Sequence, residues 1–136
     1  MTPVSKKFHP TYAKTLLNIA KGDLDTAKIL LAHPGGRPEN TFYLCQQAVE
    51  KALKAVLCHH GLALPLSHDI GALLAYLPDK ISRPPDETSL LGLTEFAMIR
   101  RYEEGLYEVT LEEIRAAVEA VDRVVSWAFA VLAESS

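Results

Sequence analysis

Apolar residues recur along this chain at spacings of three and four, which is the periodicity of amphipathic α-helices. The first periodic stretch runs from Pro10 to His33 and is ended by the prolines and paired glycines of "HPGGRP". The second runs from Glu39 to His60 and stops at Gly61. Both stretches are therefore predicted to be long helices. The first seam consists of Leu16, Ala20, Leu24, Ala27 and Leu31, and the second of Phe42, Cys45, Val49, Leu53 and Val56.

A short third helix is predicted to begin at "SHD". Ser67 is its expected N-cap, and Asp69 lies near the positive end of the helix dipole. This helix should end near Pro78. The following "DKISRPPDE" is expected to be a loop, because Pro84 and Pro85 exclude regular helix there.

Two further helices follow this loop. A fourth is predicted from Asp86 to Glu104, and Gly105 could end it. The fifth opens with "TLEE", in which Thr110 and Glu113 form a capping box. Their apolar positions are Leu90, Leu91, Thr94, Ala97 and Met98 in the fourth helix, and Ile114, Val118, Val121, Val125, Ala128 and Leu132 in the fifth.

These elements predict an all-α fold. Nothing in the pattern reads as a strand, because the alternation of apolar and polar residues that strands show is missing. Four long amphipathic helices and one short helix with brief connections form an antiparallel up-and-down bundle. The 136 residues fit a single helical domain that spans residues 1–136.

The composition restricts the classes of function that the protein can have. Hydrophobic residues make up 49% of the chain and charged residues 23%, so there is enough apolar mass for a core. The net charge of -3 argues against a broad electrostatic nucleic-acid binder, since such proteins carry a basic excess. Any site that binds phosphate must therefore be confined to a small part of the surface.

The chain is expected to work in the cytoplasm. Its start, "MTPVSKKFHP", is too polar for a secretory signal, and "VVSWAFAVLA" is about half the roughly 20 residues that span a bilayer. Cys45 and Cys58 fall in one predicted helix, where their separation of about 20 Å excludes a disulfide between them. Free thiols indicate a reducing compartment.

The second helix carries more polar residues than its seam requires. Gln46, Gln47, Glu50, Lys51 and Lys54 interrupt an otherwise alanine-rich stretch. One interpretation is a solvated face, in which Glu50 and Lys54 form an i,i+4 pair that contributes a few tenths of a kcal/mol.

The same residues also resemble a known signature. The segment "FYLCQQAVEKALKAVLCHHGLALPLSHDIGALL" is similar to the core of the HEPN family, small helical domains named for nucleotide binding in higher eukaryotes and prokaryotes. The family pattern is an aromatic residue, then Gln-Ala-x-Glu-Lys-x-x-Lys-Ala, a glycine, and a His-Asp pair that opens the next helix. The matching positions are Phe42, Gln47, Ala48, Glu50, Lys51, Lys54, Ala55, Gly61, His68 and Asp69.

The resemblance implies an up-and-down bundle that forms homodimers. It also implies a minimal nucleotidyltransferase as protein partner, in a toxin–antitoxin-like system. Active family members are metal-independent ribonucleases that use an Arg-x(4–6)-His motif near the end of the bundle.

The candidate segment for that motif is "IRRYEEGLYEV". Counted from Arg100, the shortest form of the motif would place histidine at position 105, which is Gly105. Counted from Arg101, the candidate positions hold Leu106, Tyr107 and Glu108, and no histidine follows His68. A fuller form, Arg-x4-His-x-Tyr, has a tyrosine that the partner can modify, and this tyrosine aligns with Tyr107. The arginines of the motif are present, but the histidine that would act as the general base is missing.

The sequence therefore predicts a dimeric, non-catalytic module that binds a nucleotide or RNA. The expected binding residues are Arg100, Arg101, Tyr102, Tyr107, His68, Lys51 and Lys54. Arginine forks hold phosphate oxygens, and tyrosine faces hold bases. In a purely structural alternative, the two arginines cap helix carbonyls and pair with Glu103 or Glu104. His68 then fixes the loop to the third helix.

Two other function classes remain open. One is a divergent metal-independent ribonuclease toxin in which Arg100 and Arg101 act with a displaced base such as His68. The other is an adaptor that binds only protein. No metal or cofactor is expected, because Cys58, His59 and His60 point about 100° apart on a helix and cannot converge on one ion.

Overall fold

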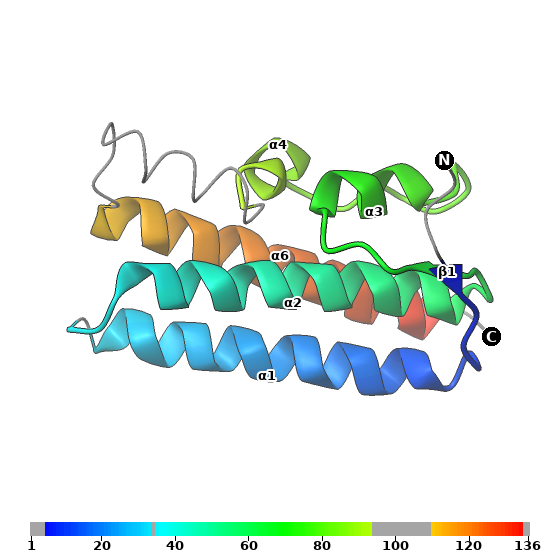
Figure 1. Ribbon diagram of the computed structural model, residues 1–136, viewed down its shortest axis with the longest axis horizontal. Coiled ribbons are helices and arrows are strands. Elements are labelled where there is room, and N and C mark those ends of the chain that lie inside the picture. The colour runs from blue at the N-terminus through cyan, green and yellow to red at the C-terminus, as the bar shows by residue number, and fades with distance from the viewer. Residues whose placement is uncertain (1–4, 34, 94–109, 135–136) are drawn as a thin grey trace.

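The computed structural model describes residues 5–33, 35–93 and 110–134, and these are mainly helical (Figure 1). Three long helices lie within two residues of their predicted bounds. In chain order the elements are β1 (Ser5–Lys6), α1 (Tyr12–Ala32), α2 (Pro38–His59), β2 (Leu64–Pro65), α3 (Ile70–Tyr76), α4 (Glu87–Leu91) and α6 (Leu111–Glu134).

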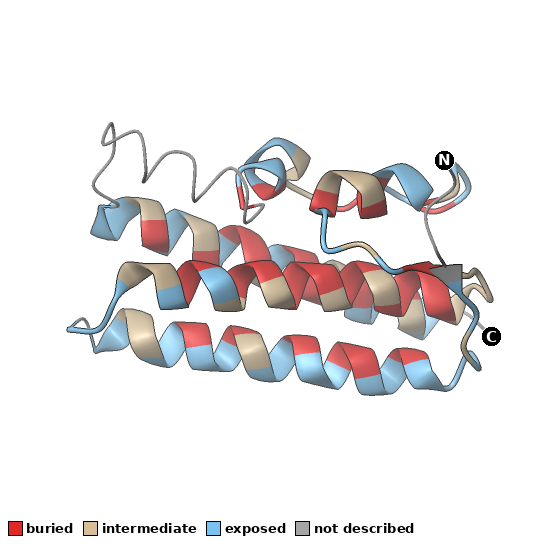
Figure 2. Ribbon diagram, viewed as in Figure 1, coloured by how far each residue is buried: buried red, intermediate tan, exposed pale blue. Residues whose placement is uncertain are grey.

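The long helices lie side by side, with α2 in the middle (Figure 1). Helix α1 runs antiparallel to α2, whereas α2 and α6 run in the same direction. Helices α3 and α4 lie on the side of α2 away from α1. Because α2 is covered by several neighbours, most of its residues are buried, whereas α1 exposes one full side (Figure 2).

The predicted apolar seams form the core. All five seam residues of α2 are buried, as are the first four of α1 and the first five of α6. Leu31 and Leu132, the last residue of the other two seams, are partly buried against this core. Burial of such side chains is the main stabilising contribution to a helical bundle.

The fourth helix differs from its prediction. The structure describes a helix of five residues, Glu87–Leu91, followed by Gly92. Residues 94–109, which include the rest of the predicted helix as far as Glu104, lie outside the described residues. Leu90 is fully buried as expected, but Leu91 is 47% exposed, so its assignment to the seam is wrong. Two leucines in succession point about 100° apart on a helix, and only one can face the core.

The prediction that no strand occurs is also wrong. Strands β1 and β2 pair antiparallel, with Ser5 opposite Pro65 and Lys6 opposite Leu64. Strands of two residues are too short for apolar alternation to be visible in the sequence. Their pairing joins the start of the chain to the segment that follows α2.

Helix capping agrees with the sequence prediction in α6 but differs from it in α3. In α6, the Thr110 hydroxyl accepts from the backbone N–H of Glu113 at 3.1 Å, and the Glu113 carboxylate accepts from the N–H of Thr110 at 3.4 Å, which confirms the capping box. In α3, however, the N-cap is Asp69 and not Ser67, because the Asp69 carboxylate accepts from the N–H of Gly71 at 2.9 Å. Ser67 accepts instead from the N–H of Asp69.

The end of α2 confirms the role predicted for Gly61. Its φ of 73° lies in the left-handed region that favours glycine. The N–H of Gly61 donates to the carbonyl of Cys58, and that of Leu62 to Leu57, which is a Schellman arrangement.

Both cysteines, Cys45 and Cys58, are free and buried. Burial raises the pKa of the Cys45 thiol to about 12, so this thiol stays protonated near neutral pH. Within the described residues, no helix is long and apolar enough to cross a membrane.

Candidate functional site

Glu50 and Gln46, two polar residues of the α2 signature, are buried. Only 4% of Gln46 and 3% of Glu50 is exposed, because α2 is the central helix. The interpretation of this stretch as a solvated face is therefore wrong at these two positions. A buried carboxylate needs partners that compensate for its lost hydration.

Glu50 has two side-chain partners, one on its own helix and one from a distant loop. The His68 Nδ1–H donates to Oε1 of Glu50 at 2.7 Å. The ammonium of Lys54, one turn further along α2, lies 3.7 Å from Oε2 of Glu50. The pair of Glu50 and Lys54 that the sequence predicted is thus present, but in a buried setting that the sequence did not reveal.

The three side chains differ sharply in their access to solvent. The exposed fraction is 5% for the Glu50 side chain and 15% for that of Lys54, but 75% for that of His68. A ligand from solvent can therefore reach the His68 imidazole directly. The buried Glu50 carboxylate holds this imidazole, and Lys54 pairs with that carboxylate.

The loop between α2 and α3 brings His68 to this place. After Gly61 the chain turns, passes through β2 and runs back along α2 before α3 begins (Figure 1). Asp69 fixes the far end of this loop by capping α3. His68 thus ties the loop to α2 through Glu50, and not to the third helix as the sequence predicted. The predicted ligand contact stays open.

The chemistry of the pair follows from the donor and acceptor roles of its atoms. An ionised carboxylate only accepts, so the hydrogen bond to Glu50 places the imidazole proton on Nδ1. In the neutral ring, Nε2 then carries the lone pair and can accept a proton. In the protonated ring, Nε2–H is a charged donor that can bind a phosphate oxygen.

Lys51 lies on the side of α2 that faces α1. Its ammonium donates to Oε1 of Gln47 at 2.7 Å and lies 3.6 Å from a carboxylate oxygen of Asp23 on α1. The Lys51 side chain is only 23% exposed. Asp23 was missed in the sequence, because no spacing within α1 indicates that it faces a lysine of the next helix.

The remaining predicted site residues cannot be placed. Arg100, Arg101, Tyr102 and Tyr107 all lie outside the described residues. Among the predicted residues that the structure describes, it joins Lys54 and His68 through Glu50 and leaves Lys51 with a separate partner. Sequence reasoning listed Lys54 and His68 as site residues but named Glu50 only as the partner of Lys54 and as part of the signature.

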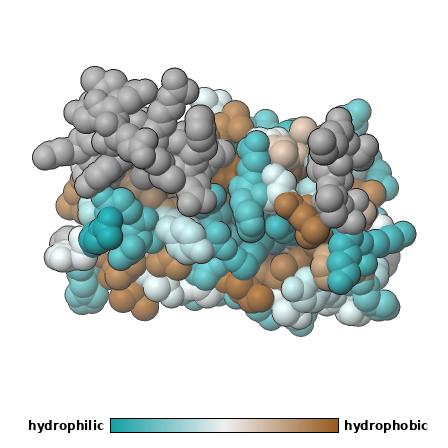
Figure 3. Space-filling model, in the orientation of Figure 1, coloured by the Kyte–Doolittle hydropathy of each residue, from teal (hydrophilic) through white to brown (hydrophobic). Residues whose placement is uncertain are grey.

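On the face seen in Figure 3, hydrophilic residues are interspersed with hydrophobic ones over α1 and α2. The described part of the chain contains no group of three or more His, Cys, Asp or Glu side chains that could hold a metal ion. His59 and His60 meet edge to face, with ring centroids 5.3 Å apart.

Comparisons with known proteins identify the family to which the signature with Glu50 and His68 belongs. The model of the HEPN domain matches residues 13–132. The chain belongs to the HEPN domain family. No curated protein sequence matches this HEPN chain.

A solved structure that the HEPN chain resembles is the crystal structure of TT1696 from Thermus thermophilus. The TM-score is 0.72, with 24% sequence identity over 88% of this chain and 98% of that chain. This likeness shows the fold of the HEPN domain. The family match includes α2, the loop of His68 and most of α6, but it begins after β1.

Proposed function

We propose that this HEPN domain binds a phosphate-bearing ligand, a nucleotide or RNA, and does not cleave it. The observation that carries the proposal is the pair of Glu50 and His68, in which a buried carboxylate holds an exposed imidazole at 2.7 Å. Both residues belong to the signature that identified the family.

The pair is suited to binding phosphate. When the imidazole is protonated, Glu50 compensates for its charge on the Nδ1 side, and Nε2–H faces solvent as a charged donor. Lys54 pairs with the same Glu50 carboxylate, and Lys51 of the same helix pairs with Asp23 of α1. A small site of this kind suits a chain whose net charge is -3.

Arg100, Arg101, Tyr102 and Tyr107 complete the proposed site. Their guanidinium groups would hold further phosphate oxygens, and their aromatic rings would stack on a base. The absence of catalysis is proposed because Gly105 occupies the position at which ribonucleases of this family carry histidine. Loss of a general base typically costs about 10²- to 10⁴-fold in rate.

In its biological setting, the domain is proposed to act as a homodimer and as the partner of a minimal nucleotidyltransferase in a toxin–antitoxin-like system. Tyr107 is the residue that such a partner could modify. Two observations test this setting: a nucleotidyltransferase reading frame beside the gene, and co-purification of its product with this chain.

Titration calorimetry with ATP and with a short RNA tests the binding itself. We expect His68→Ala to weaken binding about tenfold, because a charge-assisted hydrogen bond contributes about 1.5–3 kcal/mol. His33→Ala is the matched control, since His33 is exposed at the other end of α1 and should leave binding unchanged. Absence of binding at millimolar ligand would contradict the proposal and favour the adaptor that binds only protein.

One observation favours a second function, a divergent ribonuclease. A carboxylate that orients an exposed imidazole is the arrangement that prepares histidine as a general base. His68 with Arg100 and Arg101 could then cleave RNA without metal. Metal-independent cleavage that is lost in both Glu50→Gln and Arg100→Ala would establish this activity and overturn the non-catalytic assignment.

A further inference from the structure

The start of the chain carries a charge opposite to that of the whole. The segment "KKFHPTYAK", Lys6 to Lys14, lies within a stretch of 22 residues that contains no acidic residue, and all 17 acidic residues of the chain follow from Asp23 onward. This segment lies almost entirely before the HEPN match, which begins at residue 13. Its properties therefore belong to this chain and not to the family signature.

The lysines of this segment differ from four of the five lysines further along the chain. Lys6, Lys7 and Lys14 are exposed, and none of them pairs with a described carboxylate. By contrast, Lys21 pairs with Asp25 at 2.9 Å on α1, and Lys28, Lys51 and Lys54 also lie within 4.0 Å of a carboxylate oxygen. The positive charge of the first segment is thus available to an external anion.

Aromatic rings lie between these charges. Phe8 and Tyr12 stack, with ring centroids 5.1 Å apart and planes at 27°. The ammonium of Lys6 lies 5.3 Å from the centroid of the Phe8 ring. Phe8 is half-buried and packs against the core, whereas Tyr12 is 37% exposed. The inner ring thus anchors an outer ring that a planar ligand can reach.

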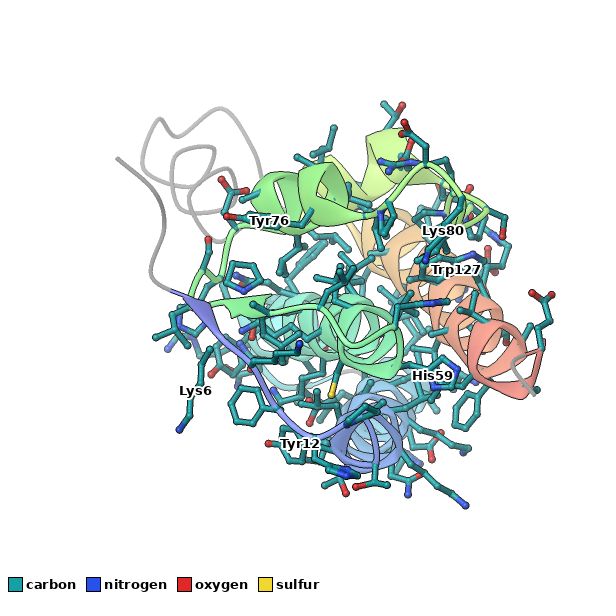
Figure 4. All side chains as sticks on the ribbon, turned by 90° about the vertical axis from the view of Figure 1, so that its right-hand side faces the viewer. Lys6, Tyr12, His59, Tyr76, Lys80 and Trp127 are labelled. Atoms are coloured by element: carbon teal, nitrogen blue, oxygen red, sulfur yellow. The ribbon has the colours of Figure 1, made fainter. Side chains whose placement is uncertain are left out.

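The fold holds this segment beside the proposed phosphate site. Lys6 pairs with Leu64 of β2, and the Cys58 thiol donates to the carbonyl of His9 at 3.4 Å. Only three residues lead from Pro65 of β2 to His68, a reach of at most about 10 Å. Lys6 and Tyr12 extend from the same side of the molecule, opposite the side that carries His59 and Trp127 (Figure 4).

We infer that this segment is a binding surface for single-stranded RNA, which extends from the His68 site along β1 to the start of α1. Unpaired lysines that alternate with an accessible ring match a strand in which phosphates alternate with unpaired bases. The inference rests on the proposed function and narrows its ligand from a mononucleotide to a strand. An acidic protein would use the lysines but gain little from Tyr12.

The test uses fluorescence anisotropy of the full chain with a labelled oligouridine of about 20 nucleotides, long enough to cover one binding site. Lys6→Gln/Lys7→Gln should weaken binding at least about tenfold and reduce the slope of log K against log salt by about 1.4, or about 0.7 per lost contact. The control Lys21→Gln/Lys28→Gln removes the same charge from lysines that are already paired, and it should stay within about twofold of wild type. Equal losses in both double variants would overturn the inference.

Tyr12 separates RNA from other polyanions. Tyr12→Ala should weaken binding of oligouridine at least about fivefold and leave binding of an abasic strand of equal length unchanged, whereas Tyr12→Phe should retain affinity. Polyglutamate that binds as well as oligouridine, or equal effects of Tyr12→Ala on both strands, would contradict the inference in favour of an acidic partner.

Binding of ATP by the same proteins tells the two proposals apart. Under the proposed function, ATP is expected to contact the His68 site alone, so its affinity should be unchanged in the Lys6, Lys7 and Tyr12 variants. If ATP binds and oligouridine does not, the RNA surface is wrong and the proposed function stands. If neither binds, both fail.

Discussion

Two regions of this HEPN domain carry lysines and a histidine close together. Their lysines differ in exposure to solvent and in pairing with carboxylates. On α2, Lys51 and Lys54 are largely covered and paired with carboxylates. In the N-terminal segment, Lys6 and Lys7 are exposed and have no described carboxylate partner. The first region matches the family signature, and the second precedes it.

This difference separates the signature residues that stabilise the fold from those that can contact a ligand. A central helix buries its polar residues, and the buried Glu50 carboxylate therefore requires partners at fixed positions, which are Lys54 on α2 and His68 in the loop before α3. Much of the signature therefore describes how the bundle is held together. Contact with ligand falls to the exposed member, His68, and to residues outside the central helix.

The largest expected effect concerns stability in the first region. Glu50→Ala should lower the free energy of unfolding by about 3 kcal/mol, because it leaves Lys54 without its carboxylate in a largely covered position. Urea denaturation measures the change. Asp25→Ala removes an exposed i,i+4 partner of Lys21 and should cost less than about 0.5 kcal/mol. Similar values for the two variants would show that the two kinds of ion pair do not differ.

The second largest effect should be a difference between the two regions in their dependence on salt concentration. If Lys6, Lys7 and Lys14 contact three phosphates, raising salt from about 50 to about 200 mM should weaken oligouridine binding about 20-fold, since each contact to a single strand contributes about 0.7 to the slope. The unfolding midpoint should change little over the same range, because the pair of Glu50 and Lys54 is largely shielded from ions. Salt-independent RNA binding would argue against phosphate contacts in the N-terminal segment.

A smaller effect should appear when one lysine of each region is replaced by methionine. Lys51→Met should cost about 1 kcal/mol of stability, because it removes partners for Asp23 and Gln47 in a partly buried setting. Lys7→Met should leave stability unchanged within about 0.5 kcal/mol and weaken oligouridine binding instead. Thermal denaturation and anisotropy on the same samples compare the two, and a loss of RNA binding in Lys51→Met alone would reverse the assignment of the regions.

Much of the fold could be predicted because its signals are local. Thr110 and Glu113 are three residues apart, and Gly61 ends α2 through its own φ, so each could be identified from a few adjacent letters. The family followed from an ordered set of residues within one helix and the loop after it. The choice of Asp69 over Ser67 as N-cap was missed because both types cap helices well, and only the backbone decides between them.

The candidate site was less predictable because its contacts join distant segments. Glu50 and His68 are 18 positions apart, and Lys51 and Asp23 lie on different helices. The pairing of β1 with β2 joins residues about 60 positions apart, and two-residue strands leave no periodic trace. These contacts depend on how helices pack, which no spacing within a single element reveals.

The sequence by itself determined the helical class, the long helices with their apolar seams and the membership of the HEPN family, because helix periodicity and capping depend on neighbours within about one turn. The tertiary structure alone decided that Glu50 is buried and that His68 rather than Lys51 or Lys54 is open to solvent. It also decided that Lys6 pairs with Leu64, in the segment that leads to His68. Exposure and charge pairing are properties of surfaces, and the surfaces of α2 exist only once α1, α6 and the loop before α3 have packed against it.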